Sequence, residues 1–135
     1  MIRLIHQEDD TGCGLACVAM IAQVTYQEAQ ATVFPTATPR KLTFYTRPYQ
    51  LRKALRGLGI PVAARTVRIR EGRKEVMRLN TSALLQVNRQ RDNKFHWTVW
   101  DHKQGTILDP LPEPYKRLRI FGALFIGETG KEGDE

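Results

Sequence analysis

The spacing of hydrophobic residues changes near the middle of the chain, from a helical repeat to short apolar runs. The first helix is predicted at about 12–23, because apolar residues recur there every three or four positions: Leu15, Val18, Ala19 and Ala22. One face of this helix is therefore expected to be buried. A second helix is predicted to open at Thr25, since Thr25 and Glu28 form a capping-box pattern. A third is predicted at about 48–58, with Gly59 as its stop signal.

The second half of the chain is predicted to form strands. Apolar and β-branched runs bounded by turn residues predict strands near 62–69, 83–87, 95–100, 106–109 and 123–126. A short helix is also expected around 71–78. Helices that precede strands along a chain are typical of the α+β class. We therefore expect N-terminal helices that pack on a C-terminal antiparallel sheet.

The length of 135 residues is enough for one good core but hardly for two, so 1–127 is predicted to be a single domain. Residues 128–135 are polar and glycine-rich, and we expect this tail to be disordered. The longest wholly apolar run, ACVAMIA, is far shorter than a membrane span, and the opening MIRLIH lacks the apolar core of a signal peptide. Two cysteines four residues apart make no disulfide framework. The expected location is therefore the cytoplasm, or a destination reached by a non-classical secretion route.

The net charge is +7, from 21 basic and 14 acidic residues, with basic clusters at 65–78 and 116–119. Such a balance can indicate nucleic-acid binding. However, the basic residues are spread over predicted helices, strands and loops, and no helix-turn-helix, zinc-finger or RNA-binding signature occurs. Most charge runs are solvated faces. We therefore expect an acidic protein partner or substrate rather than nucleic acid.

Cys13 is the residue whose position has the clearest chemical meaning. It lies where the first helix is predicted to begin, and the unpaired N–H groups and positive dipole end of a helix favour the thiolate, which is the nucleophilic form. Gly12 and Gly14 flank it, and residues without a Cβ would let a substrate backbone approach the sulfur. The alternative is that Cys13 only packs, as most single cysteines in helices do.

Cys17 lies one turn later, falls on the predicted apolar face and is expected to belong to the core. A disulfide between the two cysteines is disfavoured, because the bond demands Cβ directions that consecutive helical turns rarely provide. A zinc site of Cys13, Cys17 and a histidine is also disfavoured, since the cysteine spacing is wider than the usual knuckle and no second pair follows. We expect neither a metal nor a cofactor.

The stretch KFHWTVWDHKQGTILDP predicts a β-hairpin that would bring His96 and Asp109 together. A loop with an even number of residues pairs odd positions with even ones, so these two residues would share a face as opposite or diagonal neighbours. They could then hydrogen-bond. The carboxylate would fix the imidazole, whose other nitrogen would face the thiol.

The two other histidines, His6 and His102, lie near the amino terminus and the hairpin turn and are expected to be solvated. His96 is therefore the predicted base. Pro110 restrains Asp109 to an extended conformation, which suits the end of a strand. Taken alone, the Asp109-Pro110 pair would fit an ordinary turn equally well.

Together these motifs resemble those of the C39 bacteriocin-processing peptidases, papain-like cysteine peptidases best known as the amino-terminal domain of leader-cleaving transporters. That family opens with a glutamine six residues before the cysteine, a Cys-Gly pair and a small-residue helix, to which Gln7, Cys13-Gly14 and LACVAMI are similar. The segment HWTVWD resembles its histidine motif, and LDP at 108–110 resembles its aspartate motif. YQLRKALRGLGIPV and FGALFIG resemble its second conserved helix and last strand, so the resemblance covers most of the chain.

The resemblance implies a papain-like fold and four catalytic residues: Cys13 as nucleophile, His96 as general base and acid, Asp109 as the orienting carboxylate, and Gln7 as the side-chain donor of the oxyanion hole. A neutral amide N–H near the nucleophile is chemically suited to that last role. The chain departs from the family pattern at Gly12, where many members carry an aspartate. Here the nearest aspartates are displaced upstream, to positions 9 and 10.

The resemblance also implies cleavage after a Gly-Gly pair, because a narrow cleft would exclude larger side chains beside the nucleophile. Tyr45, Tyr49 and Trp97 are candidates for aromatic walls of that cleft. Each could equally belong to the core, and for Trp97 the core is the preferred place.

Three functions of different classes are compatible with these residues. The first is a stand-alone cysteine endopeptidase that cleaves a Gly-Gly leader or another glycine-containing site, beside a separately encoded transporter. The second is a toxin or effector peptidase that cleaves a target protein in a competing cell and is blocked by a cognate inhibitor. The third is a non-catalytic module that binds a peptide in the same groove. The intact set of four catalytic residue types argues against the third.

Overall fold

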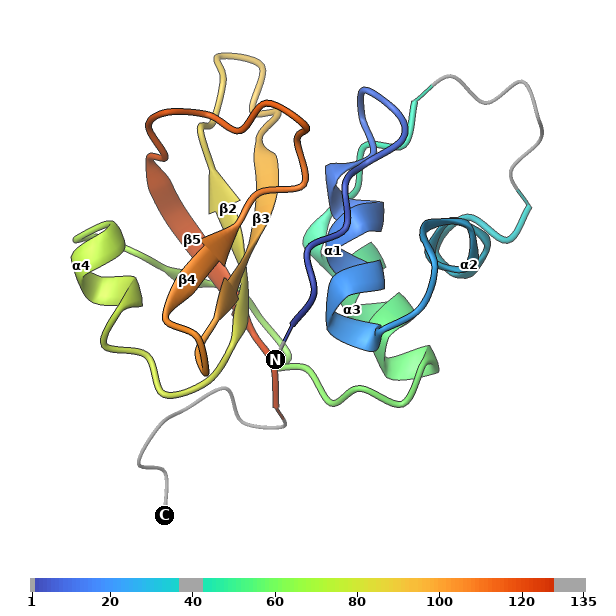
Figure 1. Cartoon of the computed structure of the whole chain (residues 1–135), viewed down its shortest axis with the longest axis horizontal. Helices are drawn as coiled ribbons and strands as arrows, with labels where there is room; N and C mark the ends of the chain where they lie inside the picture. Colours follow the sequence, from blue (N-terminus) through green and yellow to red (C-terminus); the bar gives the residue numbers. More distant parts are fainter. Residues whose placement is uncertain (1, 37–42, 128–135) are drawn as a thin grey trace.

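The helices of the first half and the strands of the second half form separate layers in the computed structural model of the chain, which describes residues 2–36 and 43–127 (Figure 1). The helices are α1 (Cys13–Ala22), α2 (Tyr26–Val33), α3 (Pro48–Gly57) and the short α4 (Arg73–Val76). The strands are β1 (Val67–Arg68), β2 (Ala83–Val87), β3 (His96–Asp101), β4 (Thr106–Leu108) and β5 (Ile120–Phe125). The predicted α+β class is confirmed.

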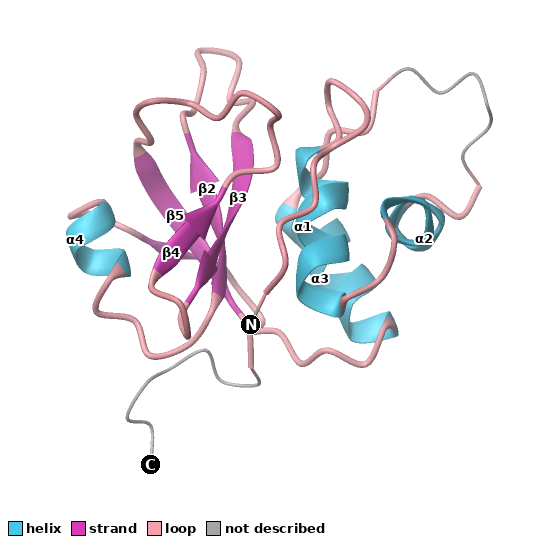
Figure 2. Cartoon of the chain, in the orientation of Figure 1, coloured by secondary structure: helices cyan, strands magenta, loops and turns pink. Residues whose placement is uncertain are grey.

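The strands form one antiparallel sheet in the order β1-β5-β2-β3-β4. Figure 2 shows α1, α2 and α3 gathered on one side of this sheet and α4 on the other. Each face of the sheet therefore has its own apolar core. Leu84, Trp97 and Leu124 pack with α1, while Leu85, Trp100 and Val76 belong to the core on the α4 side.

The central helix is α1, which contacts β3, α2 and α3. All eight residues from Cys13 to Met20 are buried. The expectation of a single buried face was therefore wrong, because α1 is covered by the sheet on one side and by two helices on the others. This enclosure holds the start of α1 rigidly against the start of β3.

The capping predictions for α2 and α3 are confirmed. The Glu28 N–H donates to the Thr25 hydroxyl at 3.0 Å, and the Thr25 N–H donates to the Glu28 carboxylate at 3.1 Å. After α3 ends, Gly59 adopts a positive φ of 85°, which glycine tolerates best. The short helix expected around 71–78 forms as α4.

The prediction of a strand over 62–69 was wrong for most of its length. Val62 forms only an isolated bridge to Ile126, the chain bends at 64–65, and β1 is two residues long. The strand predicted at 123–126 instead begins at Ile120. The other three strands lie within one residue of their predicted bounds. The tail 128–135 lies outside the described residues. Within the described residues, no helix is long and apolar enough to cross a bilayer.

Candidate active site

Cys13 is the first residue of α1 and lies against the start of β3. The Trp97 backbone N–H donates to the Cys13 Sγ at 3.4 Å, so the sulfur touches the residue that follows His96. Gly12 occupies the N-cap position and offers no side chain to cap the helix. The first N–H groups of α1 therefore keep their partial positive charge beside the sulfur, which favours a negative charge there. The cysteine is 6% exposed.

His96 and Asp109 form a buried hydrogen bond, with 2.7 Å between His96 Nε2 and Asp109 Oδ1. In the register of β3 and β4, Val99 pairs with Leu108, so Asp109, the next residue, takes the position opposite Thr98. This makes Asp109 a diagonal neighbour of His96 on the same face. The predicted shared face and hydrogen bond are confirmed. Because Nε2 is used by Asp109, Nδ1 is the ring nitrogen left to interact with Cys13.

The charge states of the pair follow from its surroundings. Burial lowers the pKa of His96, but hydrogen bonds with Asp109 and Cys13 and their negative charges outweigh it and raise the pKa to about 9. Burial raises the pKa of Asp109, yet the hydrogen bond from His96 and two backbone N–H donors hold it below its usual value. At neutral pH the pair is therefore an imidazolium and a carboxylate. An imidazolium beside Cys13 also stabilises negative charge on the sulfur.

The loop after β4 fixes Asp109 in place. The Leu111 N–H donates to Asp109 Oδ1 at 3.0 Å, and the Tyr115 N–H donates to Oδ2 at 3.3 Å. The Tyr115 ring packs edge-on against the His96 ring, with centroids 5.3 Å apart. Sequence reasoning missed these two supports. The only available signal was the PLPEPY segment at 110–115, whose three closely spaced prolines restrict this loop.

Gln7 lies beside the site on the loop that leads into α1. Its backbone N–H donates to the Pro110 carbonyl at 2.9 Å, which ties it to the residue after Asp109. Its Nε2 donates to the carbonyls of Asp9 and Asp10 at 2.9 and 3.0 Å. The amide nitrogen is therefore used within the loop, while Gln7 Oε1 is buried without a hydrogen-bond partner among the described residues. To donate to an oxyanion, the amide would have to release one of these two carbonyls. The role of Gln7 as an oxyanion donor stays a prediction.

Gly12 and Gly14 are needed for internal packing, and the interpretation that they let a substrate backbone approach the sulfur stays a prediction. A Cβ on Gly12 would overlap the Tyr26 hydroxyl, and a Cβ on Gly14 would overlap the Thr46 hydroxyl. Tyr26 in turn donates to Asp9 Oδ2 at 2.7 Å. The absence of an aspartate at position 12 thus makes room for a tyrosine from α2.

A groove of about 450 Å³ is lined by residues within 45–50 and by residues 92–95, the last of which precedes His96. Tyr45 and Tyr49 line it and are 46% and 56% exposed, so both predicted aromatic walls lie on this groove. Trp97 is 1% exposed, which confirms its expected place in the core. Its indole N–H donates to the Thr46 carbonyl at 3.2 Å and fixes the loop that carries Tyr45.

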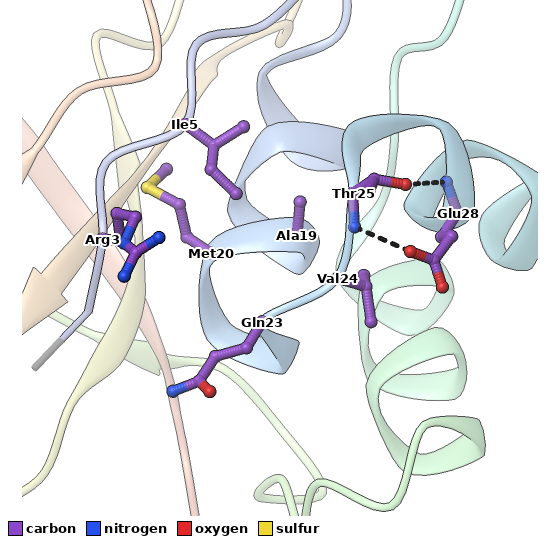
Figure 3. Close-up of a pocket in the computed structure, with 8 residues that line it drawn as sticks. All are labelled: Arg3, Ile5, Ala19, Met20, Gln23, Val24, Thr25 and Glu28. Carbon is purple, nitrogen blue, oxygen red and sulfur yellow. Dashed lines mark hydrogen bonds between the residues drawn. The ribbon is translucent and has the colours of Figure 1, made fainter.

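A second cavity, of about 590 Å³, lies between the N-terminal segment and the end of α1. Figure 3 shows the side chains that line it. Its lining includes Arg3, Ile5, Met20 and Gln23. Because Met20 and Gln23 lie at the C-terminal end of α1, this cavity is separated from Cys13 by the length of the helix.

The remaining predicted residues also have clear places. His6 and His102 are exposed, as expected, and Cys17 is fully buried in the core. Both cysteines are free thiols. In residues 2–36 and 43–127, no three histidine, cysteine or acidic side chains come together in a way that could hold a metal ion.

Comparison with models of known protein families gives no match, and comparison with curated proteins gives none either.

Proposed function

We propose that the protein is a papain-like cysteine peptidase in which Cys13 is the nucleophile, His96 the general acid and base, Asp109 the orienting carboxylate and Gln7 the oxyanion donor. The observation that supports this most is the buried 2.7 Å bond between His96 and Asp109, with Cys13 at a helix start beside it. This arrangement has the parts of a catalytic triad, which is recognised by geometry and not by sequence position. The proposal depends on this geometry, since no family model matches.

The chemistry would proceed in two halves. The Cys13 thiolate attacks the carbonyl carbon of the peptide bond, and the C–N bond breaks as the His96 imidazolium gives its proton to the departing amine. A thioester then joins Cys13 to the acyl part of the substrate. Water attacks this thioester, neutral His96 takes a proton from the water, and the carboxylic acid leaves as the thiolate is restored. Asp109 keeps the ring oriented throughout.

A preference for glycine near the cleaved bond is the substrate class that we propose. The Cys13 side chain is almost fully buried, and the chain's own Tyr26 and Thr46 hydroxyls crowd the glycines on either side of it. A substrate with a large side chain next to the reacting carbonyl would clash in such surroundings, whereas Gly-Gly would not.

The test is cleavage of a mixed panel of peptides, some containing Gly-Gly, followed by mass spectrometry under reducing conditions. We expect cleavage after Gly-Gly by the wild type and a loss of about a thousandfold or more in Cys13→Ala. Cys17→Ala is the matched control and should retain activity, because Cys17 has no role in the mechanism. Equal cleavage by wild type and Cys13→Ala would overturn the proposal. No cleavage of any peptide would replace it with an effector that needs a folded target, or with a binding module.

A further inference from the structure

A row of residues crosses the sheet from the candidate active site toward its opposite edge. Trp97, whose N–H contacts Cys13, pairs with Gln86. Gln86 pairs with Gly122, which in turn pairs with Arg68. Directly paired residues project from the same face of a sheet, so this row lies on the face that α1 covers at Trp97. Arg68 lies beyond that cover and is exposed.

The far end of the row opens into a groove of about 710 Å³, which we call the arginine groove. Its lining consists of Thr66, Val67, Arg68, Ile69, Arg70, Gln86, Arg89 and Phe121, and includes no carboxylate. Gln86 leans over Gly122, where a Cβ would overlap its Oε1. The amide therefore lies on the groove floor, where it can pair with a peptide backbone.

The three arginines of the groove are available for a ligand. In the part of the chain that the structure describes, the salt bridges are Arg78 to Glu71, Lys94 to Asp92, and His96 to Asp109. None of these uses a groove arginine. Arg89 stacks over the Phe121 ring at 4.4 Å, which holds its guanidinium at the groove wall. Arg70 has a carboxylate near it: its backbone N–H donates to Glu75 Oε1 at 2.8 Å, and its charge helps to lower the pKa of Glu75.

The arginine groove lies next to the groove that Phe95 lines. Phe121, from the first, packs edge-on against Phe95, from the second, with centroids 5.5 Å apart. From β3 to β1 there are three strand spacings, or about 14 Å. An extended polypeptide covers that distance with about four residues. Arg68 therefore lies about four extended residues away from the strand whose Trp97 contacts Cys13.

We infer that the arginine groove binds an acidic segment of the substrate polypeptide, about four residues or more from the cleaved bond. This inference rests on the proposed function, because it assigns the acidic segment to the chain that the site would cleave. Arginine pairs well with carboxylates and equally with phosphates. A polypeptide is favoured because the groove is aligned with the candidate nucleophile. The basic side chains of α4, Arg73 and Lys74, do not extend the groove, since α4 lies beyond the other face of the sheet.

The experiment uses four fluorescent peptides of equal length with a central Gly-Gly. Two carry a run of glutamates that begins four residues before or after the Gly-Gly, and two carry glutamines at the same positions. Binding to Cys13→Ala is measured by fluorescence anisotropy, and cleavage by wild type is measured separately. We expect one glutamate peptide to bind about tenfold more tightly than its glutamine twin at low salt, with most of the difference lost at high salt.

The variant Arg68→Gln/Arg70→Gln/Arg89→Gln should abolish this preference. The matched control Arg73→Gln/Lys74→Gln/Lys103→Gln removes the same charge from exposed positions outside the groove and should retain it. A preference below twofold, or an equal loss in the control, would overturn the inference. Tighter binding of a single-stranded DNA, dependent on the same arginines, would overturn it in favour of nucleic acid. Preferential binding without cleavage would contradict only the proposed function. Cleavage without a preference for glutamate would contradict only the inference that the arginine groove binds an acidic segment.

Discussion

Two cysteines one helical turn apart in α1 have very different surroundings. Cys13 lies at the start of the helix beside His96, whereas Cys17 is fully enclosed. Burial raises the pKa of the Cys17 thiol well above its ordinary value, and negative charge on Cys13 and Asp109 adds to the rise. Cys17 therefore stays a neutral thiol at neutral pH, and the thiolate is the reactive form.

We predict that iodoacetamide alkylates Cys13 of the folded protein at neutral pH at least about a hundredfold faster than Cys17. Peptide mapping by mass spectrometry measures both rates. In denaturant the two rates should become similar, because both thiols are then solvated. Asp109→Asn should slow alkylation of Cys13, since it weakens the imidazolium that stabilises the thiolate. Comparable labelling of both cysteines in the native protein would contradict the assigned roles.

Three of the four candidate catalytic residues could be found from local sequence patterns, whereas the role of Gln7 came from the resemblance to the peptidase family. Cys13 marks a helix start, and the parity of the hairpin positions relates His96 to Asp109. Tyr115 and Thr46 could not be found in this way. Both lie in irregular segments without hydrophobic periodicity, and they reach the site through long-range contacts that only the folded chain creates.

The packing of α1 against α2 depends on a glycine at position 12. The Tyr26 hydroxyl occupies the space that a Cβ would need, so Gly12→Ala should reduce the free energy of unfolding by about 1–3 kcal/mol through overpacking. In a Tyr26→Phe background the hydroxyl is gone, and the cost of Gly12→Ala should fall by about 1 kcal/mol. Chemical denaturation of the four proteins gives this coupling.

Gly57 provides the matched control for that cycle. It is the last residue of α3, and a Cβ there would meet no atom within 4 Å. Gly57→Ala should therefore be neutral or should stabilise the protein by about 0.5–1 kcal/mol, whether or not Tyr26 is changed. If Gly12→Ala and Gly57→Ala reduced the free energy of unfolding equally, and by the same amounts in the Tyr26→Phe background, Tyr26 would not restrict position 12.

The sheet was predicted well at its centre and poorly at one edge. The strands β2, β3 and β4 have apolar or β-branched runs that tertiary contacts reinforce. At the edge, the chain from 62 to 69 has strand-like composition, but it bends at 64–65, where the Ala64 carbonyl accepts a hydrogen bond from Arg52. In β5, the basic residues before Ile120 and the glycine at 122 do not fit a strand pattern, so the first half of the strand was not predicted. A Cβ at position 122 would overlap the Gln86 Oε1, which explains the glycine there.

The whole protein should respond to pH through the His96–Asp109 pair, because both side chains are less than 10% exposed. The pKa of His96 rises from an ordinary 6.5 to about 9 on folding. A raised histidine pKa gives stability that is fully present below about pH 6.5 and is lost as the pH rises through 9. The depressed pKa of Asp109 acts in the opposite direction, so its contribution is lost only in acid, below the ordinary carboxyl range.

We therefore predict that the free energy of unfolding falls by about 3 kcal/mol between pH 6.5 and 9 because of His96. Denaturant titrations across this range, under reducing conditions, measure the fall. Cys17 adds a further decrease near the top of the range, since its thiol ionises only in the unfolded chain. Asp109→Asn retains Cys17 and should lose more than half of the His96 contribution, so the difference between the two curves isolates the pair. The exposed-site control His102→Gln should follow the wild type, and identical slopes for wild type and Asp109→Asn would contradict a charged pair.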